Sequence, residues 1–118
     1  MRALRFAPYG AGLLAIWIFS AMERPPIPEP LMFWHSDKLL HLLAYAVLAA
    51  LALFAVHSHR HAATTAVLMS ALYGAVDELH QSYVPGRQCS LLDLAADTMG
   101  ALLCIAAWLS FRRRAQPS

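Results

Sequence analysis

The sequence predicts an all-α integral membrane bundle of four transmembrane helices, formed by a single domain over residues 1–118. Hydrophobic residues make up 59% of the chain and charged residues 14%, and the mean hydropathy is +0.50. Soluble domains have roughly 45–50% apolar and about 25% charged residues. Along the chain, stretches whose only charges are basic alternate with two stretches that hold all seven acids. The composition therefore excludes a soluble domain and a disordered chain.

Four apolar segments have the length that a membrane helix requires. A bilayer core about 30 Å thick needs roughly 20 helical residues. Segments of about this length occupy residues 6–22, 37–56, 62–83 and 90–111. They are expected to be helices because backbone groups in lipid must be paired within their own segment.

The first segment, residues 6–22, carries no charge. Arg2 and Arg5 in front of it are typical of a signal peptide, but residues 20–22 make a poor cleavage site. We therefore expect this segment to be retained as the first helix of the bundle.

The connections between the segments also fit a bundle. Residues 23–36 contain four prolines, which favour extended backbone, and Ser36 is a candidate cap for a helix with Asp37 in its first turn. A short polar turn at residues 57–61 precedes the third segment. Residues 84–87 read Val-Pro-Gly-Arg, typical of a type II turn, and lead into the fourth segment.

The distribution of charge predicts the orientation. The N-terminus, the 57–61 turn and the C-terminal tail hold six basic residues and no acid: Arg2, Arg5, Arg60, Arg112, Arg113 and Arg114. The opposite face holds three basic residues and all seven acids: Arg24, Lys38, Arg87, Glu23, Glu29, Asp37, Asp77, Glu78, Asp93 and Asp97. Net charges of +6 and −4 place both termini in the cytoplasm by the positive-inside rule.

Polar residues cluster where three of the predicted helices reach the acidic face. Asp37, His41 and Tyr45 are spaced four residues apart and share one helix face. The third helix and its following turn bring Tyr73, Asp77, Glu78, His80, Gln81 and Arg87 to the same level. The fourth helix adds Ser90, Asp93, Asp97 and Gly100, which lie within about 80° of arc.

Asp97 is the deepest acid of the fourth helix, about 10 Å below Ser90 along the helix axis. A charge in the bilayer should face the bundle interior and find a partner there, and intramembrane ionisable residues are functional candidates. The cations available to Asp97 are Arg87, Lys38 and, when protonated, His41.

Two blocks of this sequence resemble the VanZ-like membrane proteins. The first is Asp37-Lys38-x-x-His41-x-x-x-Tyr45, and the second runs from Asp77-Glu78-Leu79-His80-Gln81 through Val84-Pro85-Gly86-Arg87 to Gly100. The resemblance covers about residues 37–101. It implies a site that centres on Asp37, His41, Tyr45, Glu78, Gln81, Arg87, Ser90, Asp93 and Gly100. At the position of Asp97 the family often has Asn, so this chain adds a charge there.

The resemblance also implies a multi-pass protein of the bacterial inner membrane, in a family associated with resistance to the glycopeptide teicoplanin. The first functional hypothesis is a site that binds or acts on an envelope precursor or another lipid-linked anionic ligand. Arg87 would bind the anionic group, His41 and Glu78 would move protons, and Asp93 would orient a partner. The ligand-binding residues of this hypothesis are Asp37, His41, Tyr45, Glu78, Gln81, Arg87, Ser90, Asp93 and Asp97.

Other classes of function stay open at this point. The cluster could only fasten helices in an envelope complex, or it could relay protons in transport, with a homo-oligomer compensating for the missing inverted repeats. Metal-dependent catalysis is a further alternative, with Asp37, His41, Glu78, His80 and Asp93 as ligand types. No metal site is predicted, because a motif such as His-Glu-x-x-His is absent from the sequence. The sequence identifies no cofactor.

Three further features of the sequence indicate a function less specifically. His57, His59 and His61 resemble a metal-binding tract, but a polar turn is the preferred interpretation. Cys89 and Cys104 are separated by about 22 Å of helix rise, too far for a disulfide. The chain has no basic domain, which argues against a nucleic-acid partner.

Overall fold

In the computed structural model, residues 2–21, 36–85 and 91–115 are described, and they are almost entirely helical. A short 3-10 helix, η1 (Arg2–Arg5), leads into α1 (Phe6–Ala21), which is followed by α2 (Ser36–Val56), α3 (Ala62–Gln81) and α4 (Leu91–Ala115). The described residues contain no strand. The predicted four-helix, all-α fold is therefore confirmed.

Two predicted boundaries move by a few residues. The third helix ends at Gln81 rather than residue 83, because Ser82, Tyr83 and Val84 form a turn ahead of Pro85. Pro85 disfavours the helical conformation at Val84 and has no N–H to bond the Gln81 carbonyl, so the helix cannot continue through this turn. The fourth helix continues to Ala115 rather than residue 111. Its last turn holds three arginines, which interact favourably with a helix C-terminus.

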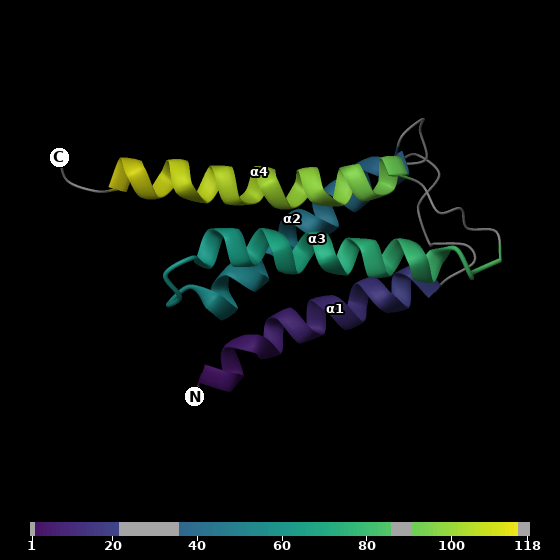
Figure 1. Cartoon of the computed structure of the whole chain (residues 1–118), viewed down its shortest axis with the longest axis horizontal. Helices are drawn as coiled ribbons and strands as arrows, with labels where there is room; N and C mark the ends of the chain where they lie inside the picture. Colours follow the sequence, from purple (N-terminus) through teal and green to yellow (C-terminus); the bar gives the residue numbers. More distant parts are fainter. Residues whose placement is uncertain (1, 22–35, 86–90, 116–118) are drawn as a thin grey trace.

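The helices form an elongated bundle with extents of 51 × 30 × 24 Å. Helix α2 packs on all three other helices and most extensively on α4, whereas α1 lies at the edge of the bundle and contacts α2 and α3 (Figure 1). The start of η1, the α2–α3 turn and the end of α4 lie at the same end of the bundle (Figure 1). Arg5, Arg60 and the three arginines in the last turn of α4 therefore gather at this end, as the charge pattern predicts; which side of a membrane it faces stays a prediction.

Within the residues that the structure describes, three helical segments are long and apolar enough to cross a membrane, namely Ala3–Ala21, Lys38–Val56 and Leu91–Ala115. Helix α3 is not among them, since it carries Asp77 and Glu78 within its 20 residues. That α3 also spans the bilayer stays a prediction.

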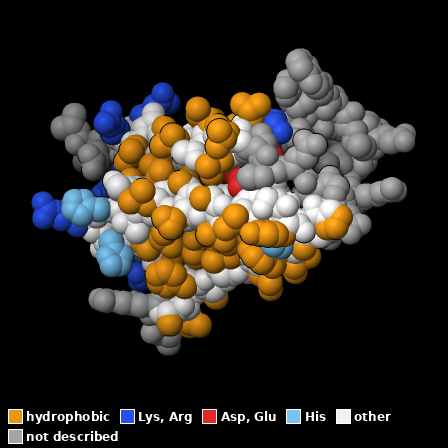
Figure 2. Space-filling model, turned by 45° about the vertical axis from the view of Figure 1, so that its right-hand side comes forward, with side chains coloured by type: hydrophobic (Ala, Val, Ile, Leu, Met, Phe, Trp, Pro, Cys, Tyr) orange, Lys and Arg blue, Asp and Glu red, His pale blue; other side chains and the backbone are white. Residues whose placement is uncertain are grey.

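The outside of the bundle is apolar and part of its inside is polar. Large hydrophobic side chains on every helix are exposed, for example Leu14, Val47, Leu72 and Leu103, and they cover much of the face in Figure 2. Buried polar or charged residues include Asp77, which is 1% exposed. This inversion of the soluble pattern is that of a multi-pass membrane protein whose surface contacts lipid.

The bundle divides into two halves along its length. Near the α2–α3 turn, small and aliphatic residues form the apolar core, which consists of Ala52, Leu53, Ala55, Val56, Ala62, Ala66 and Ile105. The other half holds the buried acids of α3 and α4. Gly100 lies in this second half, at the crossing of α2 and α4, and a Cβ atom there would lie 2.1 Å from the Leu42 carbonyl oxygen. Only glycine permits this approach of the two backbones.

Candidate functional site

The polar residues of the second half form one cluster, where α2 begins, α3 ends and α4 begins. We call it the polar cluster; its members are Lys38, His41, Tyr45, Asp77, Glu78, Gln81, Asp93 and Asp97. All but Lys38 and His41 are buried. From the sequence, seven of these eight residues were assigned to a ligand site or to its cations. The eighth, Asp77, was expected at the same level of the bundle.

His41 and Asp97 connect α2 to α4. The His41 Nδ1 atom lies 2.7 Å from Asp97 Oδ1, and the Asp97 side chain is completely buried. Two glycines make room for this pair. Gly100 brings α4 against α2, and a Cβ atom at Gly74 of α3 would lie 3.2 Å from Asp97 Oδ2. Of the two candidate cations that the structure describes, Lys38 and His41, His41 is therefore the one that contacts Asp97.

Lys38 pairs with another acid of α4. Its Nζ atom lies 2.6 Å from Asp93 Oδ1, and the two side chains are 28% and 8% exposed. The pair is thus near the end of the bundle, with Lys38 partly open. Among the described residues of the polar cluster, Lys38 is the permanently charged cation.

Tyr45 connects α2 to α3. Its hydroxyl donates a hydrogen bond of 2.9 Å to Asp77 Oδ2, and both residues are 1% exposed. The neighbouring Tyr73 ring lies 6.5 Å away between centroids, and its hydroxyl donates to the Leu13 carbonyl of α1 at 2.7 Å. A buried carboxylate is costly without hydrogen-bond donors, so Tyr45 is a principal support of Asp77.

Helix α1 also contributes to the site, which sequence reasoning did not predict. Gln81 Nε2 donates to Ser20 Oγ at 3.3 Å, and the Trp17 ring stacks on His80 with centroids 3.7 Å apart. The available signal was Ser20, a polar residue at the acidic end of an otherwise apolar segment. The site is therefore formed by four helices rather than three.

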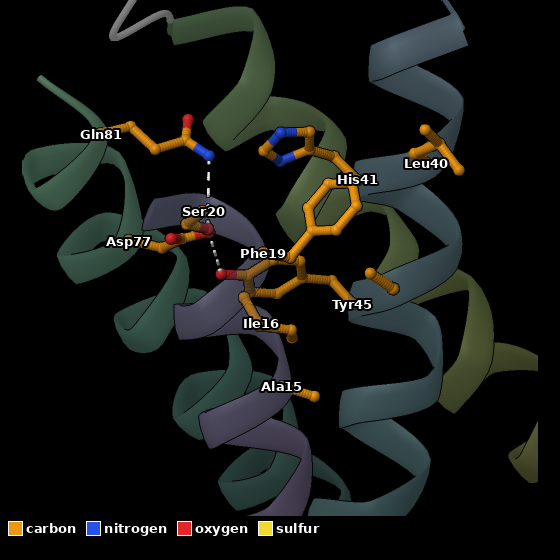
Figure 3. Close-up of a pocket in the computed structure, with 10 residues that line it drawn as sticks. Ala15, Ile16, Phe19, Ser20, Leu40, His41, Tyr45, Asp77 and Gln81 are labelled. Atoms are coloured by element: carbon orange, nitrogen blue, oxygen red, sulfur yellow. Dashed lines mark hydrogen bonds between the residues drawn. The ribbon is translucent and has the colours of Figure 1, made fainter. Parts of the chain in front are cut away.

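A pocket of about 260 Å³ lies beside the polar cluster, between α1, α2 and α3 (Figure 3). In Figure 3, Tyr45 projects from α2 toward Asp77 of α3, and Gln81 of α3 lies beside Ser20 of α1. The polar lining residues are Ser20, His41, Tyr45, Asp77 and Gln81. The apolar lining residues are Ala15, Ile16, Phe19, Leu40 and Ala44. The pocket thus offers hydrogen-bonding groups next to a hydrocarbon-like wall.

The cluster holds more carboxylates than cations. Asp77, Glu78, Asp93 and Asp97 are at most 5% exposed. Two groups of three residues bring a ligand atom of each member within 4.8 Å of the others: His41 with Glu78 and Asp93, and His41 with Asp77 and Asp97. Residue types and proximity are therefore suitable for a cation as well as for proton transfer.

Some predicted residues lie outside this description. Arg87 and Ser90 are outside the described residues, as is Cys89, and the same holds for the side chains of Ser36 and Asp37. His57, His59 and His61 are exposed in and beside the α2–α3 turn, and His57 Nδ1 lies 2.7 Å from the Phe54 carbonyl oxygen. That turn agrees with the polar-turn interpretation of the three histidines.

Comparison with protein families identifies the family of this chain. Neither the curated proteins nor the solved structures contain a match to this chain. Residues 6–112, which include all of α1, α2 and α3 and most of α4, match the VanZ/LLP1 family. The match thus includes the first helix and both sequence blocks that hold the polar cluster, and the chain belongs to the VanZ/LLP1 family.

Proposed function

We propose that this protein binds the anionic head of a lipid-linked envelope precursor in the pocket beside the polar cluster. The observation that carries the proposal is the composition of the pocket wall. The pocket is lined by hydrogen-bonding groups of α1, α2 and α3 together with alanine, leucine, isoleucine and phenylalanine side chains of α1 and α2. A lipid phosphate likewise combines a polar head with an apolar chain.

The residues of the pocket suit the head group in different ways. Gln81 and Ser20 supply neutral donors, and Lys38 supplies positive charge at the partly exposed rim of the cluster. Arg87, which follows α3 in the sequence, is the second proposed cation. If the bound precursor reacts, His41 and Glu78 are the proton carriers in this proposal, and Asp93 holds Lys38 in place.

The proposed location is the outer face of the bacterial cytoplasmic membrane. The support is the basic group of residues at the opposite end of the bundle, which the positive-inside rule assigns to the cytoplasm. A protein that binds an envelope precursor at that face would change the target that glycopeptides reach. Such an activity would account for the association of VanZ-like proteins with teicoplanin resistance.

The test measures lipid binding by the full chain after the pocket has been filled. Ala44 lines the pocket, whereas Ala50 is exposed on the same helix and provides a matched control. Vesicles of phosphatidylcholine with and without undecaprenyl phosphate are the probe. We expect Ala44→Phe to weaken binding to the phosphate-containing vesicles at least about tenfold, or about 1.4 kcal/mol, and Ala50→Phe to leave it unchanged. Equal binding by both variants would refute the proposal.

A second candidate function is structural, and a specific observation favours it. The contacts His41–Asp97, Tyr45–Asp77, Lys38–Asp93 and Gln81–Ser20 each join two different helices. A cluster that only holds helices together would show this pattern. In that case Gln81→Leu should lower the melting temperature in detergent without changing lipid affinity. Under the binding proposal, the same variant lowers the affinity as well.

A further inference from the structure

We propose that His41, Asp77 and Asp97 hold a divalent cation, with Zn²⁺ as the preferred ion. The three residues come from α2, α3 and α4, and each offers a ligand atom within 4.8 Å of the other two. Asp77 and Asp97 are 1% and 0% exposed, and the His41 side chain is 16% exposed. The group is therefore shielded from bulk solvent and open at its imidazole.

The hydrogen bonds around the two carboxylates leave one oxygen of each open to a ligand. Asp77 Oδ2 accepts from Tyr45, and Asp97 Oδ1 lies against the His41 imidazole. The second oxygen of each carboxylate, Asp77 Oδ1 and Asp97 Oδ2, is buried and has no hydrogen-bond partner in the described part of the chain. Buried polar atoms normally have partners, and two such oxygens on carboxylates grouped with one imidazole would suit a ligand that carries positive charge.

The charge of the surroundings leads to the same conclusion. Four buried carboxylates of the polar cluster lie near Lys38, which pairs with Asp93, and near the imidazole of His41. Each buried ion costs several kcal/mol unless another charge offsets it. Protonation of some carboxylates would reduce this charge; a divalent cation would also satisfy the two oxygens that have no partner.

The supporting contacts resemble those around metal ligands in general. A residue that ligates a metal is commonly oriented by a hydrogen bond to its other polar atom. Tyr45 holds one oxygen of Asp77 in this way, and the His41–Asp97 contact fixes the imidazole against a carboxylate. The mixture of imidazole nitrogen and carboxylate oxygen favours Zn²⁺ or Mn²⁺ over Ca²⁺, which takes oxygen ligands alone.

The sequence did not reveal this site because each ligand comes from a different helix. A motif such as His-Glu-x-x-His places two ligands on one helix face. Here the α3 and α4 carboxylates approach His41 only after Gly74 and Gly100 have allowed the helices to pack closely. A cation in this position would also provide positive charge next to the pocket. That last role rests on the proposed function, whereas the cation site itself does not.

The test measures zinc binding by the full chain in detergent, after treatment with a chelator. Zn²⁺ alone is the probe, the readout is calorimetric titration, and elemental analysis gives the stoichiometry. We expect one Zn²⁺ per chain. Asp77→Asn should weaken binding at least about 100-fold, and Tyr45→Phe should weaken it about tenfold, as expected for a residue that orients a ligand.

Two controls keep the result interpretable. The triple variant His57→Ala, His59→Ala, His61→Ala removes the exposed histidines and should bind Zn²⁺ like the original chain. Circular dichroism checks that each variant is helical. If Asp97→Asn fails to fold, Asp77→Asn and Tyr45→Phe still decide the matter. The inference is overturned if the folded chain binds no Zn²⁺, or if Asp77→Asn binds it unchanged.

The outcome also separates this inference from the proposed function. Binding of undecaprenyl phosphate vesicles by a chain that takes up no Zn²⁺ leaves the lipid proposal in place and removes the cation site. Uptake of Zn²⁺ by a chain that binds no lipid phosphate leaves the cation site in place and removes the lipid proposal.

Discussion

The two halves of the bundle are held together by different interactions. The half near the α2–α3 turn contains the apolar core, in which Ala52, Ala66 and Ile105 are buried. The other half contains the polar cluster, in which each hydrogen bond or ion pair described above connects two helices. Lipid tails are as apolar as the core residues, so burial of the core gains packing but little hydrophobic free energy. Buried carboxylates, by contrast, find no replacement partners in lipid.

The comparison indicates where the specificity of the fold resides. Small residues allow the helices to approach in both halves, but only in the polar half does a particular side chain require a particular partner. Substitutions in the polar half should therefore cost more than substitutions of similar size in the apolar core. Four measurements of stability, made on purified protein in detergent, test this expectation.

The largest effect is expected at Gly100. A methyl group there would meet the backbone of Leu42 at a distance that no side-chain movement can relieve, so α2 and α4 must separate. We expect Gly100→Ala to lower the free energy of unfolding by about 3 kcal/mol. Gly10→Ala is the matched control, because nothing lies within 4 Å of its added Cβ atom. Gly10→Ala should leave the free energy of unfolding unchanged or raise it by up to about 1 kcal/mol. Similar melting temperatures for both variants would contradict the close crossing.

The next effect is expected at Tyr45. Tyr45→Phe removes the hydroxyl that donates to Asp77 and leaves a buried carboxylate oxygen without that donor. We expect the free energy of unfolding to fall by about 2 kcal/mol. Tyr83→Phe serves as the control, since Tyr83 is 80% exposed and its substitution should be close to neutral. A loss for Tyr45→Phe no greater than that of its control would show that the polar half does not stabilise the fold.

A smaller effect is expected in the apolar core. Ile105 is 5% exposed, and Ile105→Val removes one buried methylene group, for an expected loss of about 1 kcal/mol. Leu103→Val on the same helix removes a similar group from a side chain that is 52% exposed, and should change stability by less than about 0.5 kcal/mol. If Ile105→Val cost more than Tyr45→Phe, the ranking of the two halves would be reversed.

The smallest effect is expected at Tyr73. Its hydroxyl donates to the Leu13 carbonyl and joins α3 to the edge helix α1. Hydrogen bonds between membrane helices average about 0.6 kcal/mol, and Tyr73→Phe should cost about that much. Chemical denaturation can resolve a difference of this size if the Phe variant is measured beside the original chain. A loss equal to that of Tyr45→Phe would mean that α1 is held as firmly as the central helices.

The helix positions could be predicted from the sequence because a membrane helix requires a long apolar segment, which is visible in the sequence itself. Four helices lie within a few residues of the predicted segments, and the deviations come from Pro85 and from the arginines that end α4. The partner of Asp97 could not be chosen in the same way. Lys38 and His41 lie on one helix a single turn apart, and the choice between them depends on how the close approach of α4 at Gly100 aligns the two helices.

The pocket shows a second limit of sequence reasoning. Periodicity places Asp37, His41 and Tyr45 on one face of a helix, but it does not say which other helix covers that face. Helix α1 carries no ionisable group other than Tyr9, and Ser20 alone was too weak a signal to predict that this helix forms one wall of a polar site. Its role became visible only through the contact between Gln81 and Ser20 and the stacking of His80 on Trp17.

The contacts of α1 have a consequence for the order in which the protein assembles. Helix α1 is synthesised first, but its hydrogen bonds at Leu13 and Ser20 are made with Tyr73 and Gln81, which lie 60 and 61 residues further along the chain. Its charge-free sequence allows it to wait in the lipid as a single helix until α3 has been inserted. We therefore expect α1 to dock late, and the wall that it contributes to the pocket to form only after the chain has been translated past α3.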